Sequence, residues 1–254
     1  MAHEWGRNEW IQLFERSVAF TVWGQLWRAM RVVAIGSHPD DVELGVGATI
    51  ARHVDRGHAV TFLIATDGTA GCSREDSRRR EAIAAANELG VPDIRFLGFP
   101  DTNLQADGDL VSRIESQLLD IEPDRVYVHT AADTHQDHRN CAHATQAAAR
   151  RLGTVLTYET VSTHPTMTPR HYVAITERDL RAKLAAVRAH ESQIGTPPVD
   201  EEAIRTRARF RGIQANTTYA EAFEVVKSVD PLGAIDSSDA VDSSDAVDSN
   251  DVIR

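Results

Sequence analysis

From residue 30 onward, short apolar runs alternate with longer amphipathic segments. The apolar runs predict strands over 32–36, 59–65, 94–97, 125–129, 155–159 and 172–175. Apolar residues three or four positions apart predict helices over 42–56, 77–89, 110–121, 138–152 and 178–190. Strands that alternate with helices of this length are typical of βαβ units. The pattern therefore predicts an α/β fold, a Rossmann-like three-layer sandwich with a mostly parallel central sheet.

Three segments depart from this alternation. Residues 1–29 hold all four tryptophans with helical spacing, so we expect an amphipathic N-terminal extension, although Met30 directly before the first strand is an alternative start. Residues 229–254 contain seven aspartates and little apolar surface, which predicts an acidic, low-complexity, disordered tail. We expect 195–204 to be a loop. The folded domain is then 30–228.

Composition and charge exclude several classes of protein. The net charge is −11, of which the acidic tail contributes −6, so the body has no broad basic surface and nucleic acid is not expected as a partner. The two cysteines, Cys72 and Cys141, are too few for a disulfide framework and indicate a reducing, cytoplasmic location. No run of about 18 apolar residues predicts a membrane span. Whether the chain forms a homo-oligomer is left open.

The first polar cluster is His38-Pro39-Asp40-Asp41, directly after the first strand. Loops at the carboxyl ends of parallel strands are where open α/β sheets build their sites. One imidazole nitrogen and several carboxylate oxygens are a donor set for a metal such as zinc. Alternatively, one aspartate caps the following helix and His38 only packs. This segment by itself does not decide between the two readings.

The second cluster is His135-Gln136-Asp137-His138, which follows the fourth strand and opens the next helix. In a sheet of strand order 3-2-1-4-5, strands one and four are neighbours, so both clusters converge at one crevice. Three protein ligands and an open position are the arrangement of catalytic zinc sites, and the two clusters supply enough donors.

Other histidines and cysteines carry weaker signals. We interpret four histidines without a partner at metal spacing as structural: His129, His143, His164 and His171. His53 and His58 are expected at the surface, on the first helix and its exit. Cys72 lies in an arginine-rich loop but lacks a neighbouring histidine in sequence, so a nucleophilic role is not favoured.

The two clusters resemble the LmbE-like (PIG-L) family of zinc-dependent N-deacetylases. The resemblance covers residues 30–226 and includes further segments in the family's order. These are Thr66-Asp67-Gly68, Arg78 with Glu81, Gly98-Phe99-Pro100-Asp101, His190-Glu191-Ser192-Gln193, Arg211-Gly212 and the closing Tyr219-Ala220-Glu221-Ala222-Phe223. No single motif would suffice, but together they make the resemblance specific. It implies that 30–228 is an LmbE-like deacetylase catalytic domain.

The resemblance also implies roles for individual residues. One zinc ion per chain, with Fe²⁺ as an alternative in the cell, would be bound by His38, Asp41 and His138. Asp40 would be the general base. His135 would stabilise the oxyanion or protonate the leaving amine, and Asp137 would orient a ligating histidine. Arg78 and Asp101 would lie near the substrate.

The implied activity is removal of the acetyl group from an N-acetylglucosaminyl moiety of a small-molecule conjugate, in thiol or antibiotic biosynthesis. One alternative is a zinc amidase that cleaves a larger acyl group or a thiol conjugate. A second alternative, from a different class, is a sugar-binding protein with a vestigial site.

Overall fold

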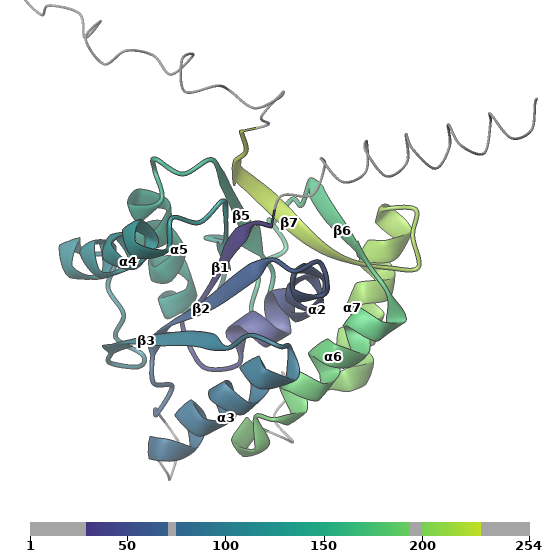
Figure 1. Ribbon diagram of the computed structural model, residues 1–254, viewed down its shortest axis with the longest axis horizontal. Coiled ribbons are helices and arrows are strands. Elements are labelled where there is room, and N and C mark those ends of the chain that lie inside the picture. The colour runs from purple at the N-terminus through teal and green to yellow at the C-terminus, as the bar shows by residue number, and fades with distance from the viewer. Residues whose placement is uncertain (1–28, 71–74, 194–199, 230–254) are drawn as a thin grey trace, which may run out of the picture.

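The computed structural model describes residues 29–70, 75–193 and 200–229, and these form an α/β sandwich (Figure 1). The strands are β1 (Arg31–Gly36), β2 (Ala59–Thr66), β3 (Asp93–Phe99), β4 (Arg125–His129), β5 (Thr154–Tyr158), β6 (His171–Ile175) and β7 (Tyr219–Lys227). They pair in the order β3-β2-β1-β4-β5-β7-β6. The five strands β3, β2, β1, β4 and β5 are parallel, and β7 and β6 extend them antiparallel. This confirms the predicted mostly parallel sheet.

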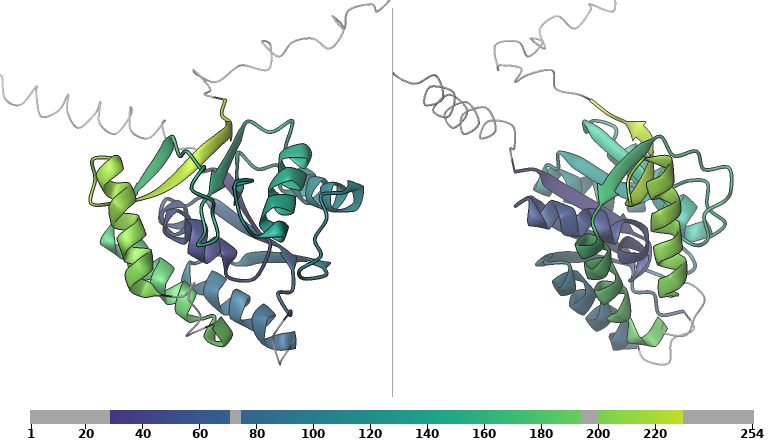
Figure 2. Two further views of the ribbon diagram at one scale, coloured as in Figure 1. Left: turned by 180° about the vertical axis from the view of Figure 1, so that it is seen from behind. Right: turned by 90° about the vertical axis from the view of Figure 1, so that its right-hand side faces the viewer.

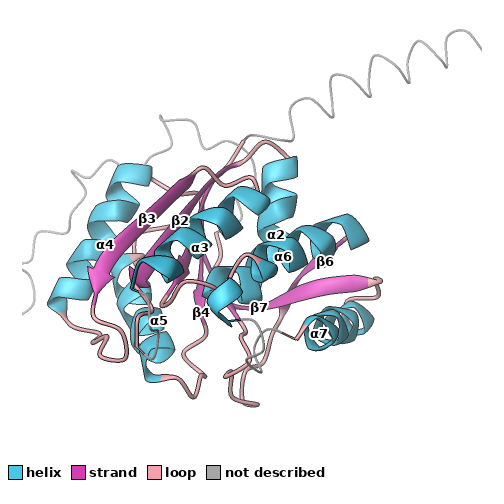
Figure 3. Ribbon diagram, turned by 90° about the horizontal axis from the view of Figure 1, so that it is seen from below, coloured by secondary structure: helices cyan, strands magenta, loops and turns pink. Residues whose placement is uncertain are grey.

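Helices cover both faces of the sheet (Figure 3). The helices are α2 (Asp41–Asp55), α3 (Glu75–Glu88), α4 (Gly108–Ile121), α5 (Gln136–Ala148), α6 (Glu177–Arg188) and α7 (Glu201–Gln214), with a short 3-10 turn at Glu191–Gln193. One apolar core lies between the sheet and α2, α3 and α6, and a second lies between the sheet and α4 and α5. Successive residues of β1, Val32 and Val33, belong to different cores because strand side chains alternate between faces.

Strand β7 and helix α7 are elements that the sequence pattern did not predict. The prediction of a loop over 195–204 is wrong for its last residues, because α7 begins at Glu201 with Asp200 as its N-cap. The helix buries only Ile204, Ala208 and Gly212, so it shows little apolar periodicity. It packs beside β7 at the end of the sheet (Figure 2). Packing against the sheet, rather than an apolar stripe in the sequence, therefore decides its helical state.

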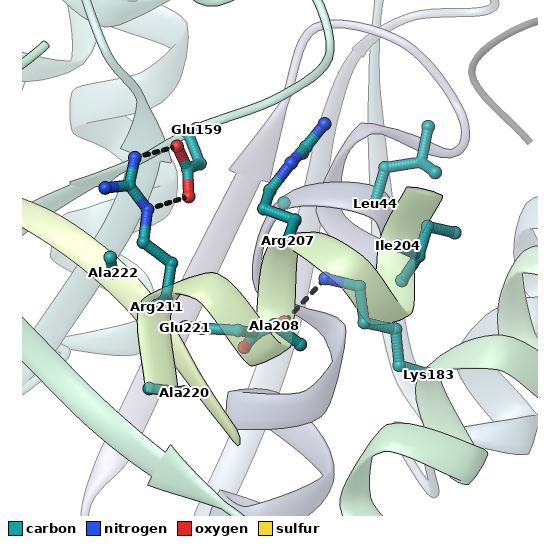
Figure 4. A pocket seen from close by; sticks show the side chains of 11 residues that line it. Leu44, Glu159, Lys183, Ile204, Arg207, Ala208, Arg211, Ala220, Glu221 and Ala222 are labelled. Carbon is teal, nitrogen blue, oxygen red and sulfur yellow. Dashed lines mark hydrogen bonds and ion pairs between the residues drawn. The ribbon is translucent and has the colours of Figure 1, made fainter. Parts of the chain in front are cut away.

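Two ion pairs help to hold α2 and α7 against the end of the sheet (Figure 4). The Lys183 Nζ atom lies 2.6 Å from Oε1 of Glu221, and this carboxylate also accepts hydrogen bonds from the backbone of α2 at Ala48 and Thr49. Arg211 on α7 donates two hydrogen bonds to Glu159, of 2.8 and 2.5 Å. Buried charges that are paired and hydrogen-bonded in this way tolerate desolvation, whereas either partner alone would not.

Several predictions fall on parts of the chain that lie outside the described residues. These are the helical character of 1–28, the acidic tail over 230–254, and the environment of Cys72. None of the helices that the structure describes is long and apolar enough to cross a membrane.

The prediction that His53 and His58 lie at the surface is wrong. Their exposed fractions are 7% and 8%. The two Nδ1 atoms lie 2.7 Å apart, and Nε2 of His53 lies 2.9 Å from the Tyr127 hydroxyl. The turn after α2 brings His58 back toward the helix, which the linear pattern does not reveal. Burial, reinforced by nearby arginines and by His58, lowers the pKa of His53 from 6.5 to about 3.

This lowered pKa predicts a loss of stability in acid. Folded His53 stays neutral down to about pH 3, whereas its imidazole in the unfolded chain protonates below about pH 6.5. Between about pH 6.5 and pH 3 the unfolded state binds more protons than the folded state, so the free energy of unfolding falls as the pH falls. Above this range His53 does not change the free energy of unfolding with pH. We expect His53→Gln to have a shallower slope than the wild type in urea unfolding between pH 7.5 and 4.5. Equal slopes would contradict the assignment.

The close contact between α2 and β5 makes a second prediction. A Cβ atom added at Gly45 would overlap the ring of Tyr158, whose hydroxyl is fixed by a 2.7 Å hydrogen bond to the Ile35 carbonyl. We expect Gly45→Ala to lower the free energy of unfolding by about 1–3 kcal/mol, as overpacked core substitutions do. Gly108→Ala is the matched control, because its Cβ would meet no atom within 4 Å. If Gly45→Ala lost no more stability than Gly108→Ala, the close packing of Gly45 against Tyr158 would not be what excludes a larger residue at position 45.

Candidate functional site

The loop after β1 places the first set of polar side chains. It ends at Asp40, whose φ of 105° turns the chain sharply into α2, so that Asp41 becomes the first helical residue. The backbone N–H of His38 donates a 2.7 Å hydrogen bond to Oδ2 of Asp41, and Nδ1 of the same histidine lies 3.2 Å from that oxygen. The loop therefore holds His38 and Asp41 against each other.

The start of α5 provides the second set. His135 is the N-cap of this helix, and its Nδ1 accepts a hydrogen bond from the backbone N–H of Asp137. His138 lies one turn into the helix, with Nε2 3.2 Å from Oδ1 of Asp41. Since β1 and β4 are paired neighbours, the loops that follow them meet at the same edge of the sheet. The expected convergence of the two clusters is thus confirmed.

The resulting arrangement can hold a metal ion. The structure brings together groups whose potential ligand atoms lie within 4.8 Å of one another: His38 with His135 and His138, Asp41 with His129 and His138, and His38 with Asp101 and Asp137. Asp41 is common to the contacts of His38 and His138, one through each carboxylate oxygen. One carboxylate and two imidazoles, all largely buried, are a donor set that suits a borderline divalent cation.

The electrostatics of this group centre on Asp41. Burial by itself disfavours its charge, but the imidazoles of His138, His129 and His38 hold the pKa of Asp41 well below its usual range. Burial likewise opposes protonation of His138, yet the carboxylates of Asp41 and Asp133 raise its pKa to about 9. The pKa of His38 is also raised, against burial, by Asp41 and two further carboxylates. The site thus attracts positive charge strongly.

Carboxylates behind the two histidines fix their orientation. The Nε2 atom of His38 lies 3.1 Å from both Asp101 and Asp137. Asp137 is itself held by backbone N–H groups of Thr102 and Leu104, which supports its predicted orienting role. Nδ1 of His138 lies 3.2 Å from Asp133. Such partners keep a ligating imidazole in one orientation and increase its basicity.

The position of Asp101 adds a contact that the sequence did not suggest. Its side chain is 9% exposed, with one oxygen toward His38 and the other accepting a 2.8 Å hydrogen bond from the Ala70 backbone. The structure therefore places Asp101 behind a candidate ligand. Its predicted contact with the substrate stays a prediction.

Asp40 lies beside the His/Asp group and is held in place by Arg78. Nη1 of Arg78 is 3.4 Å from the Asp40 carboxylate, and Nη2 donates a 2.6 Å hydrogen bond to the Pro39 carbonyl. Only 4% of Arg78 is exposed. The buried guanidinium thus fixes the loop after β1 at Pro39 and also lies against the negative charge of Asp40. Burial raises the pKa of Asp40 to about 6, although Arg78 opposes the shift. A carboxylate with this pKa can accept and return a proton near neutral pH.

The pKa of His135 is shifted in the opposite direction from that of Asp40. Burial and the neighbouring imidazoles His138 and His38 lower its pKa. Because its Nδ1 accepts from Asp137 N–H, the neutral ring carries its proton on Nε2. His135 is therefore a neutral N–H donor at pH 7, packed with its ring 4.8 Å from that of His38.

Spacing along the chain missed two residues of the site. His129 was grouped with the structural histidines, but its Nε2 lies 3.1 Å from Oδ2 of Asp41 and its ring stacks on His138 at 3.9 Å. Asp133 supports His138. The signal that could have found His129 is its place as the last residue of β4, at the carboxyl edge of the sheet. His143 and His164 are exposed and lie outside the groups that could hold a metal.

A parallel α/β sheet with a His/Asp group at its carboxyl edge defines a class of candidate metallohydrolases, and comparisons with known proteins narrow it. The model of the family described as PIG-L, GlcNAc-PI de-N-acetylase, matches residues 33–149. The uncharacterized deacetylase YaiS of Escherichia coli (strain K12) is 35% identical over 167 residues, which cover 63% of this chain and 90% of the relative. The chain belongs to the PIG-L (LmbE-like) family.

Two further likenesses extend over more of the chain. Diacetylchitobiose deacetylase of Thermococcus kodakarensis is 28% identical over 228 residues, which cover 78% of this chain and 84% of that protein. The solved structure of N,N'-diacetylchitobiose deacetylase from Pyrococcus horikoshii superimposes with a TM-score of 0.70 at 24% identity, over 88% of this chain and 94% of that one. The structural likeness shows a shared fold.

The stacking of His129 on His138 predicts an effect on metal affinity. We expect His129→Gln to weaken the binding of added Zn²⁺ about 10–100-fold, the usual cost of removing a group that orients a ligand. Competition with a chromophoric chelator measures the dissociation constant. His143→Gln, on the exposed side of α5, is the matched control. If both variants bound Zn²⁺ like the wild type, His129 would have no positioning role.

Proposed function

We propose that this protein is a zinc-dependent hydrolase that removes the acetyl group from an N-acetylglucosaminyl moiety of a small-molecule conjugate. The observation that carries the proposal is the convergence of His38 and His138 on the two oxygens of Asp41, with Asp40 held next to them. Membership of the PIG-L family supports N-deacetylation, and deacetylases of an acetylated amino sugar among the relatives support the substrate class.

The residues fit a zinc ion. In the proposal His38, Asp41 and His138 hold it. Contacts around His129 support a cation here, because its Nε2 accepts a hydrogen bond from the Ser37 N–H and so has no proton for Asp41 at 3.1 Å. Lone pairs that face each other at this distance favour a positive charge nearby. When bound, zinc lowers the pKa of a coordinated water to about 7 and polarises a carbonyl group.

Asp40 is proposed as the general base. Its carboxylate is ionised above about pH 6 and then takes a proton from the attacking water on an Oδ atom. Arg78 keeps the carboxylate in place through its 3.4 Å contact and through the Pro39 carbonyl. Because the pKa of Asp40 is raised, the protonated acid is stable enough to carry this proton to the departing amine.

His135 is proposed to act on the tetrahedral intermediate. Its Nε2–H donates toward the oxygen that gains negative charge, as preorganised donors do in acyl-transfer sites. A neutral ring suffices for this hydrogen bond, which agrees with the lowered pKa of His135. The neutral ring does not give up this proton, because that would leave an imidazolate, so the proton for the leaving amine comes from Asp40 in the proposal.

The direct test of the proposed function is acetate release from a panel of N-acetylglucosaminides. We expect the zinc-loaded protein to release acetate from at least one of them, and a chelator to stop the release. The panel should vary the group attached to the sugar, so that one positive member also identifies that group. If zinc binds but no member releases acetate, the acetyl-sugar proposal fails and a zinc amidase for larger acyl groups takes its place.

A substitution at Asp40 tests the assignment of the base. Asparagine is the sharpest replacement, since it preserves the shape and tolerates the positive φ better than alanine does. We expect Asp40→Asn to keep the metal but to lower kcat about 10²–10⁴-fold. Metal content and turnover are measured on the same sample. His138→Ala is the comparison, because it should lose the metal itself. Near-wild-type turnover in Asp40→Asn at full metal content would exclude Asp40 as the base.

A further inference from the structure

A cavity of about 230 Å³ lies at the edge of the sheet opposite the metal centre. Met30 before β1, the end of α2 and the first residue of β4 line it, whereas the metal centre follows the carboxyl ends of β1 and β4. Helix α2 has 15 residues, so the cavity lies about 20 Å from Asp41 along the helix. It is therefore separate from the site described above.

The walls of the cavity are rich in basic groups. Five of its eight lining residues are arginine or histidine: Arg52, His53, Arg56, His58 and Arg125. None of the lining residues that the structure describes is acidic. The two histidines are neutral at pH 7, so the three arginines carry the positive charge of the walls, and a cavity with such walls concentrates anions.

The end of α2 accounts for part of this charge. Arg52 lies in the last turn of the helix, where a cation offsets the partial negative charge of the free carbonyls. Arg52 also lies 3.4 Å from Asp179. Arg52 thus has a structural explanation that needs no ligand.

Arg125 has no such explanation. It comes from the start of β4, and its hydrogen bond within the described residues is a long one, 3.4 Å from Nη1 to the Tyr127 hydroxyl. Its Nε atom is buried and has no hydrogen-bond partner among the described residues, which costs free energy. A guanidinium carries five N–H donors. The geometry leaves most of these donors available to a ligand in the cavity.

The groups around Arg125 reinforce its positive potential. His53 and His58 line the same cavity, and burial together with cations that include Arg125 lowers the pKa of both. Burial and then Arg125 also lower the pKa of His171 on β6. Asp124 is the acidic group that acts in the opposite direction, on His58. Arg52 is paired with Asp179, whereas no ion pair joins Arg125 to a carboxylate among the described residues.

We propose that this cavity binds a phosphate-class oxyanion through the guanidinium of Arg125, with an N–H of the His53–His58 pair as a further donor. The planar guanidinium fork matches two oxygens of such an anion. The bound anion would supply the ion-pair partner that the Arg125 guanidinium does not have among the described residues. Because the cavity lies far from Asp40 and Asp41, binding there is independent of the proposed hydrolysis.

Inorganic phosphate is the probe for this proposal. Titration of the zinc-loaded full chain, followed by calorimetry in a non-phosphate buffer at constant ionic strength, should show saturable binding. We expect Arg125→Gln to weaken this binding at least tenfold while acetate release stays unchanged. Arg113→Gln, an exposed arginine on α4, is the matched control and should bind like the wild type.

Two further measurements separate the cavity from the metal centre. His138→Ala removes a proposed zinc ligand, so phosphate binding that persists in this variant belongs to the cavity. In the wild type, NMR titration should show that phosphate raises the pKa of His53 or His58, a readout that does not depend on any variant folding. Absence of saturable binding, equal affinity in Arg125→Gln, or unmoved histidine pKa values would each overturn the proposal. Failure of acetate release would leave it untouched.

Discussion

The site depends on one buried carboxylate that three imidazoles share. Asp41 accepts a backbone hydrogen bond from His38 and lies 3.1–3.2 Å from ring nitrogens of His38, His129 and His138. A buried carboxylate is costly unless positive charge surrounds it. His38 and His138, whose pKa values are raised, meet this requirement, which ties the loop after β1 to α5. It makes the pairing of β1 with β4 the constraint on which the geometry of the site rests.

Further charged side chains fix the orientation of the candidate ligands and of Asp40. Asp101, Asp137 and Asp133 fix the outer nitrogens of the candidate ligands, while Arg78 fixes Asp40. Most of these groups are held by backbone N–H donors or by buried contacts, so the side chains need little reorganisation before they act. The difference in pKa between Asp40, which is raised, and His135, which is lowered, separates a proton acceptor from a neutral donor.

Helix α2 connects the two ends of the molecule. Its first residue is Asp41, and its middle is clamped by the Glu221 carboxylate and by Tyr158 against Gly45. Its last turn carries Arg52 and His53 to the basic cavity. Helix α2 therefore has a fixed position between the metal centre and the basic cavity, because ion pairs and close packing leave it little room to shift.

The sequence by itself determined the parallel part of the sheet and the two motifs of the site, because period-2 and period-3.6 patterns and the position of loops after strands are local properties. It did not reveal β7, which lies between β5 and β6. It also did not reveal α7, whose polar surface lacks a helical stripe, or the burial of His53 and His58. Tertiary structure alone decided that His129 and Asp133 join the site and that Asp101 lies behind His38. These contacts join residues up to 88 positions apart, and only the folded sheet brings such residues together.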